Sequence, residues 1–403
     1  MLLLASCDNT QPENEIKKPS AGLQGPDAPQ WSPPQVPDYW LAIPLPPVKE
    51  EVYPKIPEDI MQNPQPRPVR DTISGIAVRA PGKILLQAEE ISLSRIDSIE
   101  KAFYAVNYIS TNSYFGINFD NDIFSNTDYY YTNGIRFEMV APIFSASPFA
   151  WPMLPYRRES MNYHGITVVQ NMYTPTNPDT ISVIDGDRPF AAYLYIGHSK
   201  NTLSNKKKYR QYSEIVIGLM GPGSLGGLVQ SQIHNIEPVG WQNQIQNDLV
   251  LNYTAVFEKG LINPQYFDLN IFADARIGTL YDNLGAGLRL RAGKLNSYFS
   301  MPALAKPGSL EGRNALHLQY GIMAGTRLRA IFYDATLQGG PFNRNNNYTI
   351  PASDIKRLVL QASIGFYFAY RQIGISYEHF YTSPEFRDAR HHQWGHINLS
   401  YCF

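Results

Sequence analysis

The last eight residues, HINLSYCF at 396–403, decide the fold class. Side chains of a β-strand point alternately to its two faces, so a two-residue period of apolar residues predicts a strand with one apolar face. A terminal phenylalanine is also the usual closing residue of β-barrels in bacterial outer membranes. We therefore interpret this stretch as the last strand of a barrel, with its apolar face formed by Ile397, Leu399, Tyr401 and Phe403.

The same two-residue period recurs upstream, from Tyr114 onward. Segments of about 10 residues with aromatic residues near their ends are typical of transmembrane β-strands. A soluble sandwich would alternate in the same way, but closure into a barrel removes the exposed edge of an open sheet. We therefore predict an all-β fold, one closed antiparallel transmembrane β-barrel of about 12 strands over residues 105–403. The predicted strands are 114–124, 131–141, 163–173, 188–199, 209–220, 247–258, 265–275, 283–293, 314–337, 356–369, 372–382 and 394–403.

The N-terminal part has a different composition. Fifteen of the 31 prolines lie between Pro12 and Pro68, so residues 8–83 are predicted to be a disordered, proline-rich tether in the periplasm. Residues 1–7, MLLLASC, resemble part of a signal segment with a lipoprotein cleavage box, in which Cys7 would be acylated. Residues 84–104 have apolar side chains at helical spacing and predict a short helix. The net charge of −1 gives no reason to expect nucleic-acid binding.

The connection between the first two predicted strands is unusually polar. It contains Asp120, Asn121 and Asp122 before the turn begins, although a hairpin needs only a short turn. Asn and Asp are ordinary turn residues, but strand parity places Asn121 on the lipid-facing side with Phe119, where an amide is costly unless something uses it. Oxygen-rich clusters of this kind suit a hard cation such as Ca²⁺.

A second candidate region is the connection 221–248, which emerges on the same rim if both chain termini are periplasmic. Its apolar residues recur at helical spacing from Leu225 to Ile236, and this pattern predicts a short helix in an extracellular loop. His234 lies on that helix, one turn after Gln230. A single helical histidine is more often structural than catalytic, but histidine is the usual general base at neutral pH.

Three motifs, in order, carry a family resemblance: FDNDIF followed by DYYYTNG, then QNMYTP followed by GDRPFAAYLYIG, then GLMGPGSLGGLVQSQIHNIEPVGWQNQIQN. They are similar to the lipid A 3′-O-deacylase family of outer-membrane barrels. The resemblance runs from about Phe115 to Asn247 and continues more weakly from TSPEF, 382–386, to the end. It implies a twelve-stranded barrel with a calcium-dependent esterase site at the outer rim, between the barrel wall and a helix of an extracellular loop.

Residue by residue, the resemblance places the family's Asn-Asp pair at Asn121 and Asp122, its YTxG threonine at Thr132, and its active-site histidine at His234. These residue types fit ester hydrolysis, in which His234 would deprotonate water and a cation would stabilise the oxyanion. Asp122 would help to hold Ca²⁺, and the Asn121 amide would add a hydrogen-bond donor. The family also has a lysine in the loop after the YTP-like motif. Here residues 175–187 contain no lysine, so a contact to a substrate phosphate or one polarising charge is missing.

The predicted function is an outer-membrane esterase that removes an ester-linked acyl chain from lipid A of lipopolysaccharide. Three alternatives stay open: a phospholipid-directed esterase, a non-catalytic barrel that binds lipopolysaccharide and Ca²⁺, and a small-solute porin. The porin is the least favoured because twelve strands enclose little space. We expect a monomer that is embedded in the outer membrane and inserted by the barrel-assembly machinery.

Overall fold

The computed structural model describes residues 108–403 except 111, 126–128, 158, 235–238 and 301–315. The side chains of Tyr108, Ile233 and His234 are also outside the described part. The predicted segments 1–7, 8–83 and 84–104 therefore lie outside the described residues, and their predictions stay untested.

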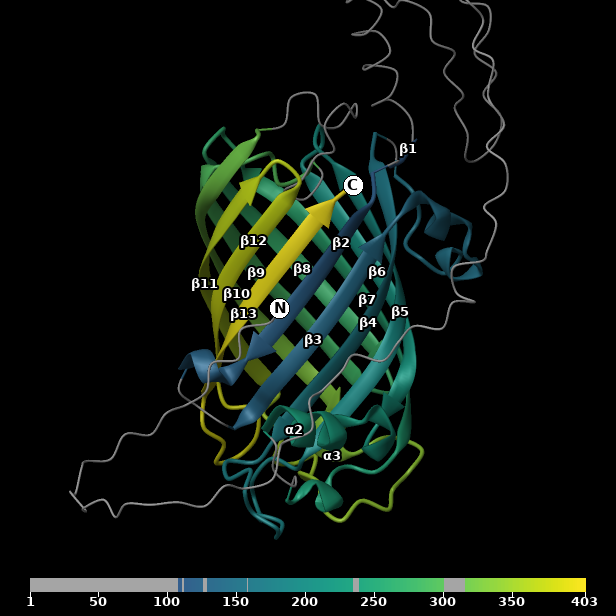
Figure 1. Cartoon of the computed structure of the whole chain (residues 1–403), viewed down its shortest axis with the longest axis vertical. Helices are drawn as coiled ribbons and strands as arrows, with labels where there is room; N and C mark the ends of the chain where they lie inside the picture. The colour runs from purple at the N-terminus through teal and green to yellow at the C-terminus, as the bar shows by residue number, and fades with distance from the viewer. Residues whose placement is uncertain (1–107, 111, 126–128, 158, 235–238, 301–315) are drawn as a thin grey trace, which may run out of the picture. The chain divides into compact units, whose positions relative to one another are not determined.

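Twelve antiparallel strands close into a barrel (Figure 1), and this confirms the predicted fold. Each strand pairs with its neighbours in the sequence, and closure comes from the pairing of the last strand with β2, for example Leu399 with Ile117. A two-residue strand, β1 (Tyr108–Ile109), adds to β4 in parallel. The barrel strands are β2 (Tyr114–Asn121), β3 (Tyr130–Val140), β4 (Met161–Thr174), β5 (Ala191–Ser204), β6 (Tyr209–Met220), β7 (Asp248–Ile262), β8 (Phe267–Gly278), β9 (Tyr281–Lys294), β10 (Leu318–Asp334), β11 (Leu358–Tyr370), β12 (Ile373–Thr382) and β13 (His392–Cys402).

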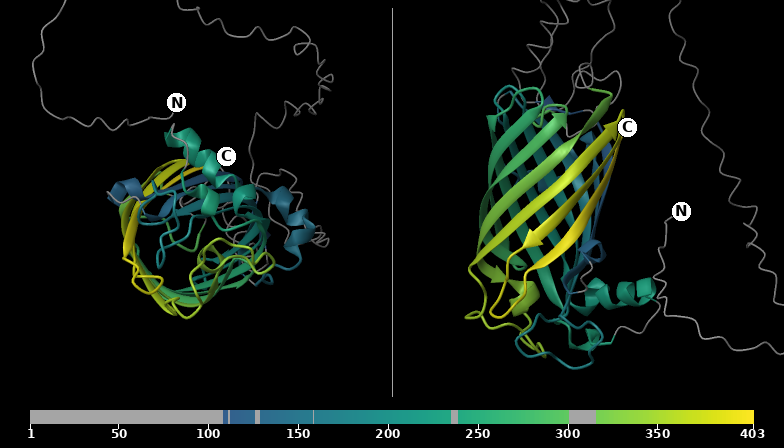
Figure 2. Two further views of the ribbon diagram at one scale, coloured as in Figure 1. Left: turned by 90° about the horizontal axis from the view of Figure 1, so that it is seen from below. Right: turned by 90° about the vertical axis from the view of Figure 1, so that its left-hand side faces the viewer.

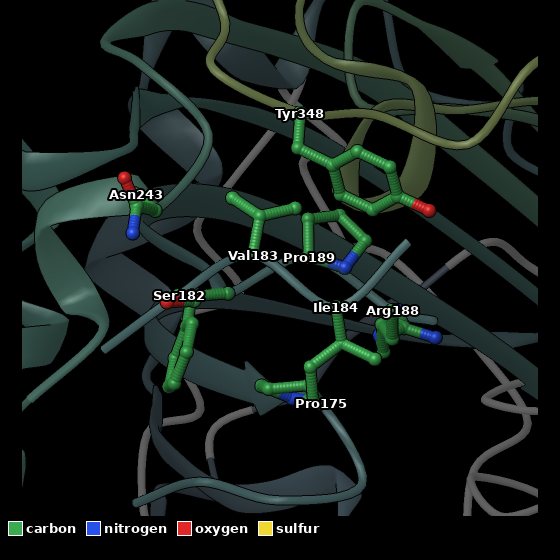
Figure 3. Close-up of a pocket in the computed structure, with 9 residues that line it drawn as sticks. Pro175, Ser182, Val183, Ile184, Arg188, Pro189, Asn243 and Tyr348 are labelled. Atoms are coloured by element: carbon green, nitrogen blue, oxygen red, sulfur yellow. The ribbon is translucent and has the colours of Figure 1, made fainter. Parts of the chain in front are cut away.

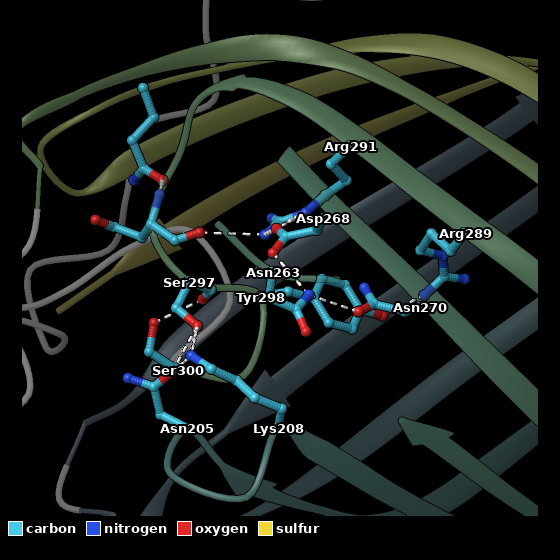
Figure 4. Close-up of polar contacts among 12 residues, drawn as sticks. Asn205, Lys208, Asn263, Asp268, Asn270, Arg289, Arg291, Ser297, Tyr298 and Ser300 are labelled. Atoms are coloured by element: carbon cyan, nitrogen blue, oxygen red, sulfur yellow. Dashed lines mark hydrogen bonds and ion pairs between the residues drawn. The ribbon is translucent and has the colours of Figure 1, made fainter. Parts of the chain in front are cut away.

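The exterior of the barrel is apolar and the interior is polar, as the two-residue period predicts. On β6, Ile217 and Leu219 are about half exposed on the outside. Inside, Arg136 of β3 reaches across the interior to Glu214 of β6, with 3.0 Å between Nη2 and Oε1. A second interior network joins Arg289 and Arg291 with acids and with Tyr298 (Figure 4). These polar and charged side chains line the interior of the barrel. None of the described helices has the length and hydropathy of a membrane span.

The two ends of the barrel differ in the elements that they carry. One end, which we call the α2 rim, holds the connections after β2, β4, β6, β8, β10 and β12 (Figure 1). The other end, the C-terminal rim, holds the end of β13 and the connection between β3 and β4. The short helices of the α2 rim are η3 (Asp122–Ser125), η6 (Pro222–Ser224), α2 (Gly226–His234), η7 (Trp241–Asn243) and α3 (Ala335–Gln338), and those of the C-terminal rim are η4 (Pro142–Ala146) and η5 (Pro148–Ala150).

Candidate active site

Helix α2 lies outside the barrel, against the walls of β4 and β5, and projects from the ring of strands (Figure 2). Its first residue is in close contact with the wall: a Cβ added to Gly226 would lie 2.4 Å from the Cβ of Ala192 and 2.9 Å from the Trp241 ring. Only glycine fits there without displacement. The first turn of the helix thus packs on an apolar cluster on the barrel exterior, formed by Met172, Phe190, Ala192 and Trp241, with Val229 packed against it.

Left-handed backbone conformations and close contacts shape the described residues on either side of this helix. Gly221, Leu225 and Gly240 have positive φ angles of 83°, 63° and 85°. At Leu225 the left-handed conformation carries a steric cost that the surrounding contacts must offset. One such contact comes from the barrel wall, where the amide of Gln170 donates to the Ser224 carbonyl at 2.6 Å. The start of α2 is therefore fixed by the left-handed conformation of Leu225 and by the hydrogen bond from Gln170 of the wall.

An apolar groove of about 270 Å³ runs between α2 and the lipid-facing wall. Leu225 and Leu228, which form its helix side, are 49% and 56% exposed. A groove of this composition that opens toward the lipid can accept a hydrocarbon chain. Its lining residues come from β3, β4, β5 and the helix: Ile135, Phe137, Val168, Gln170, Leu194, Leu225, Leu228 and Val229.

Asn121, the predicted amide of the site, ends β2 on the lipid-facing side. Phe115 of the same strand stacks on exposed Phe137 outside the barrel. Asn121 is an even number of residues from Phe115, so its side chain points to the same outer face. The Asn121 Oδ1 accepts a hydrogen bond from the Ile123 amide at 2.8 Å, so the residue also begins the turn into η3. Within the described part of the chain, the Asn121 amide nitrogen has no hydrogen-bond partner. It is therefore free to donate to a ligand.

Asp120 and Asp122, on either side of Asn121, bind different hydrogen-bond partners. Asp120 faces the interior, where it accepts hydrogen bonds from His396 Nδ1 at 2.6 Å and from the Tyr131 hydroxyl at 2.7 Å. Asp122 is the first residue of η3, and its buried carboxylate accepts the Tyr129 amide at 3.0 Å. The polar connection is therefore divided between the two faces of the wall.

The element η3 was not predicted, because 114–124 was interpreted as one strand. The strand ends three residues earlier, at Asn121, because the Asn121 side chain caps the turn. η3 folds onto the barrel exterior, where the Phe124 ring lies edge-on to Tyr377 with 5.8 Å between centroids. A Cβ on Gly395 would lie 2.6 Å from the Phe124 ring, so this contact needs the glycine.

Thr132 lies at a β-bulge between Tyr131 and Asn133, where the register of β3 with β4 shifts. Because Tyr131 faces the interior and Asn133 pairs with outward-facing Asn121, the bulge places Thr132 on the exterior as well. Its hydroxyl lies 2.7 Å from the hydroxyl of Thr174, the last residue of β4. Thr174 is a residue that the sequence analysis missed, although the YTP motif in which it stands marks the position.

Asn121 ends β2, Asp122 follows it, and Thr132 lies on the neighbouring strand β3, one residue before Asn133, the register partner of Asn121. His234 is the last residue of α2. The His234 side chain lies outside the described part, so its role stays a prediction. Carboxylate and amide oxygens are ligands that Ca²⁺ prefers, and the side-chain oxygens of Asp122 and Asn121 can each accept more than the bond described. Among the described residues, no three His, Cys, Asp or Glu side chains cluster as a metal site. The calcium prediction therefore also stays open.

Arg188, the first cation after the loop without lysine, turns inward and away from this site. Its guanidinium lies 4.2 Å from the centre of the Tyr173 ring and donates to Glu385 and to Thr336, each at 2.7 Å. Burial lowers the pKa of Arg188, but the carboxylates of Glu385 and Asp334 outweigh burial and raise the pKa above its ordinary value. Arg188 stays charged and paired inside the rim, so it does not replace the missing loop lysine.

The base of the loop between β4 and β5 contains a small apolar space. Pro175, Ile184, Pro189 and Tyr348 surround a small apolar space at the rim (Figure 3). The space measures about 10 Å³, which is hardly enough for one water molecule. The Tyr348 hydroxyl accepts the Gly186 amide at 2.7 Å and ties the loop to the α3 connection. This contact fixes the position of the loop at the rim.

Comparison with known proteins shows the family of the chain. The sequence profile of the family described as outer membrane protein LpxR matches residues 91–403. The chain belongs to the LpxR family. This confirms the resemblance inferred from the motifs.

Among solved structures, LpxR from Salmonella typhimurium is similar to the chain with a TM-score of 0.56 and 21% identity, over 72% of this chain and 99% of that one. This likeness supports the fold. The β domain of the Bordetella autotransporter BrkA covers the same share at 10% identity and a TM-score of 0.38, which is too distant to carry an argument. No curated protein matches the sequence.

Proposed function

We propose that this LpxR-family protein is an outer-membrane esterase that removes an ester-linked acyl chain from lipid A of lipopolysaccharide. The observation that carries the proposal is the apolar groove between α2 and the outer wall. Its β3 lining begins at Ile135, two residues from Asn133, which pairs with Asn121. An acyl chain in the groove would therefore place its ester end beside the polar residues of the rim.

The residues have distinct roles in this proposal. His234 takes the proton from the attacking water, and the Asn121 amide nitrogen donates to the developing oxyanion. The ester C–O bond then breaks, the fatty acid leaves, and His234 returns the proton to the oxygen of the leaving alcohol. Thr132 is held by Thr174 and orients the polar end of the substrate through its hydroxyl. Asp122 would hold Ca²⁺, which when bound supplies positive charge beside the ester carbonyl. The lipid-facing position of the site gives a membrane lipid access without leaving the bilayer.

One observation keeps a phospholipid-directed esterase as the second candidate. Residues 175–187 contain no lysine, and Arg188 is paired inside the rim with Glu385. The loop that would contact the lipid A phosphates therefore contributes no cation to the exterior. A glycerophospholipid needs the same ester chemistry and carries fewer phosphates.

The deciding experiment incubates the purified protein with lipopolysaccharide or with phospholipid, each with Ca²⁺, and identifies released fatty acid and residual lipid by mass spectrometry. We expect loss of an ester-linked chain from lipid A, and loss of that activity in His234→Ala by about 10²–10⁴-fold. His391→Ala, which changes an exposed histidine of the same rim, is the matched control and should stay active. Release from phospholipid alone would move the assignment to the second candidate. Release from neither would leave a non-catalytic, lipid-binding barrel.

A further inference from the structure

The connection between β3 and β4 at the C-terminal rim exposes an unusual set of large apolar side chains. Residues 141–160 carry η4 and η5 and lie outside the ring of strands (Figure 2). Trp151 is 90% exposed, Ile143 is 75% exposed, and Phe149 is 55% exposed. Clusters of this kind on one short segment mark an interaction surface more often than single exposed residues do.

The inner side of this segment is fixed to the barrel wall by polar contacts. Lys200 of β5 donates to the Leu154 carbonyl at 2.8 Å, and its ammonium lies 3.3 Å from the centre of the Tyr156 ring. The Leu154 amide donates to the Ser213 hydroxyl of β6 at 3.1 Å. Arg157 donates to the Gln211 side chain at 2.6 Å. The segment is therefore a built part of the wall and not a loose loop.

The wall residues beneath the segment lie on the lipid-facing side. Lys200 and His198 alternate with the same two-residue period as Ile196 of β5, so they point to the same face. Ile196 is half exposed toward the lipid. On β6, Ser213 has the parity of Ile217, which is also exposed. A polar wall residue is costly wherever acyl chains reach it. The segment covers them, and its own outer surface takes the position of the wall.

Basic side chains contact the end of the same segment. The turn between β5 and β6 contains Lys206, Lys207 and Lys208, and the side chains of the first two are 67% and 48% exposed. Glu159 at the end of the segment binds Lys206 and Lys207 at 2.5 and 2.9 Å, so the turn and the segment form one surface. Lys208 turns aside, toward Asn205 and Ser297 (Figure 4). One glutamate does not neutralise this basic end.

We propose that residues 141–160 are an interfacial anchor, which lies in the headgroup layer of the leaflet at the C-terminal rim. Tryptophan prefers the membrane–water interface, where its ring contacts the acyl boundary and its N–H stays hydrated. Lysines nearby attract the lipid phosphates. A lipid surface is the occupant because the segment continues the lipid-facing wall of β4, β5 and β6 and because its charge complements anionic headgroups.

The test measures the depth of Trp151 in a bilayer. Full-length protein is reconstituted in phosphatidylethanolamine–phosphatidylglycerol vesicles with lipids brominated near the headgroup or near the end of the acyl chain. The Trp151 contribution is the difference between wild type and Trp151→Phe. We expect headgroup-proximal bromine to quench this contribution about twofold more than deep bromine, with little access for aqueous iodide. Iodide access equal to that of a free tryptophan would overturn the anchor and favour a protein partner at this surface.

A second measurement tests the energetic role of the anchor. Trp151→Glu with Phe149→Glu should unfold at a lower temperature than wild type in vesicles, measured by heat-modifiable gel mobility, and at the same temperature in detergent. Phe342→Glu is the control, because Phe342 is 70% exposed but lies in the α3 connection at the opposite rim. An equal midpoint for the double variant and wild type in vesicles would refute the proposal.

Discussion

Gly226→Ala is the sharpest test of whether the position of α2 matters, because one added carbon displaces the helix. The new Cβ would lie 2.4 Å from the Cβ of Ala192 and 2.9 Å from the Trp241 ring. Neither neighbour can give way easily, since Ala192 is part of the barrel wall and Trp241 is buried in the cluster below the helix. The helix must move outward.

The size of the effect follows from the packing of this contact. Overpacking of one methyl group costs about 1–3 kcal/mol, and here the cost falls on the contact between α2 and the wall. The seated position of the helix then becomes about 5- to 150-fold less favourable relative to a displaced one. A displacement of about 1 Å in a positioned group can lower the rate about 10²-fold. The barrel itself should be unaffected, because its strand pairing does not involve α2.

The assay compares deacylation rate, heat-modifiable gel mobility and hydrogen exchange of α2 among matched variants. Gly227→Ala is the control, because a Cβ at Gly227 would lie 3.4 Å from Trp241, which is ordinary contact. Gly226→Ala with Ala192→Gly removes the shorter clash and should recover part of the activity. If Gly226→Ala is as active as Gly227→Ala, with equal exchange in α2, the seating of the helix on the wall has no role in function.

Three further changes test the site and its surroundings. Asp122→Ala should weaken Ca²⁺ binding, so added Ca²⁺ should partly restore hydrolysis after chelation. His234→Ala should stay inactive at every Ca²⁺ concentration. Equal rescue of both variants would contradict the separate roles. Thr132→Val leaves the Thr174 hydroxyl without its partner and should lower activity about tenfold, while Thr132→Ser keeps the bond and should stay close to wild type in the same rate assay. Arg188→Met removes the cation from a paired, partly buried carboxylate and should lower the unfolding temperature of the rim by differential scanning fluorimetry; an unchanged temperature would show that the ion pair contributes nothing.

The strands were predictable because the bilayer outside and the polar interior impose a two-residue period on them. All twelve predicted strands correspond in order to β2 through β13. Their ends were less predictable, because side chains decide them: the strand predicted at 188–199 begins instead at Ala191, since Arg188 turns inward to Glu385. That partner is 197 residues away in the sequence. Local pattern contains no information on such a contact.

The site was predictable in part for the same physical reason. The alternation of side chains along β2 correctly predicted that Asp120 and Asn121 lie on opposite faces of the wall, because the strand geometry up to Asn121 is regular. The pairing of Thr132 with Thr174 depends on a β-bulge, and one extra residue in a strand leaves no signal in the period of a short segment. The elements η4 and η5 were not predicted at all, since their apolar residues follow neither a helical nor a strand period.

Two segments pack on the outer wall, residues 141–160 at the C-terminal rim and helix α2 at the other rim, and they differ in the polar groups that they leave beside them. At the C-terminal rim, Lys200 and Ser213 face the lipid side, and the covering segment supplies a partner to each through Leu154. At the α2 rim, Asn121 also faces the lipid side, yet its amide nitrogen has no partner among the described residues. A donor at the edge of a bilayer is costly unless a ligand satisfies it. The segment at the C-terminal rim completes the wall. Helix α2 instead leaves a donor and an apolar groove on the same outer wall, and under the proposed function the ester group and the acyl chain of one lipid would occupy them.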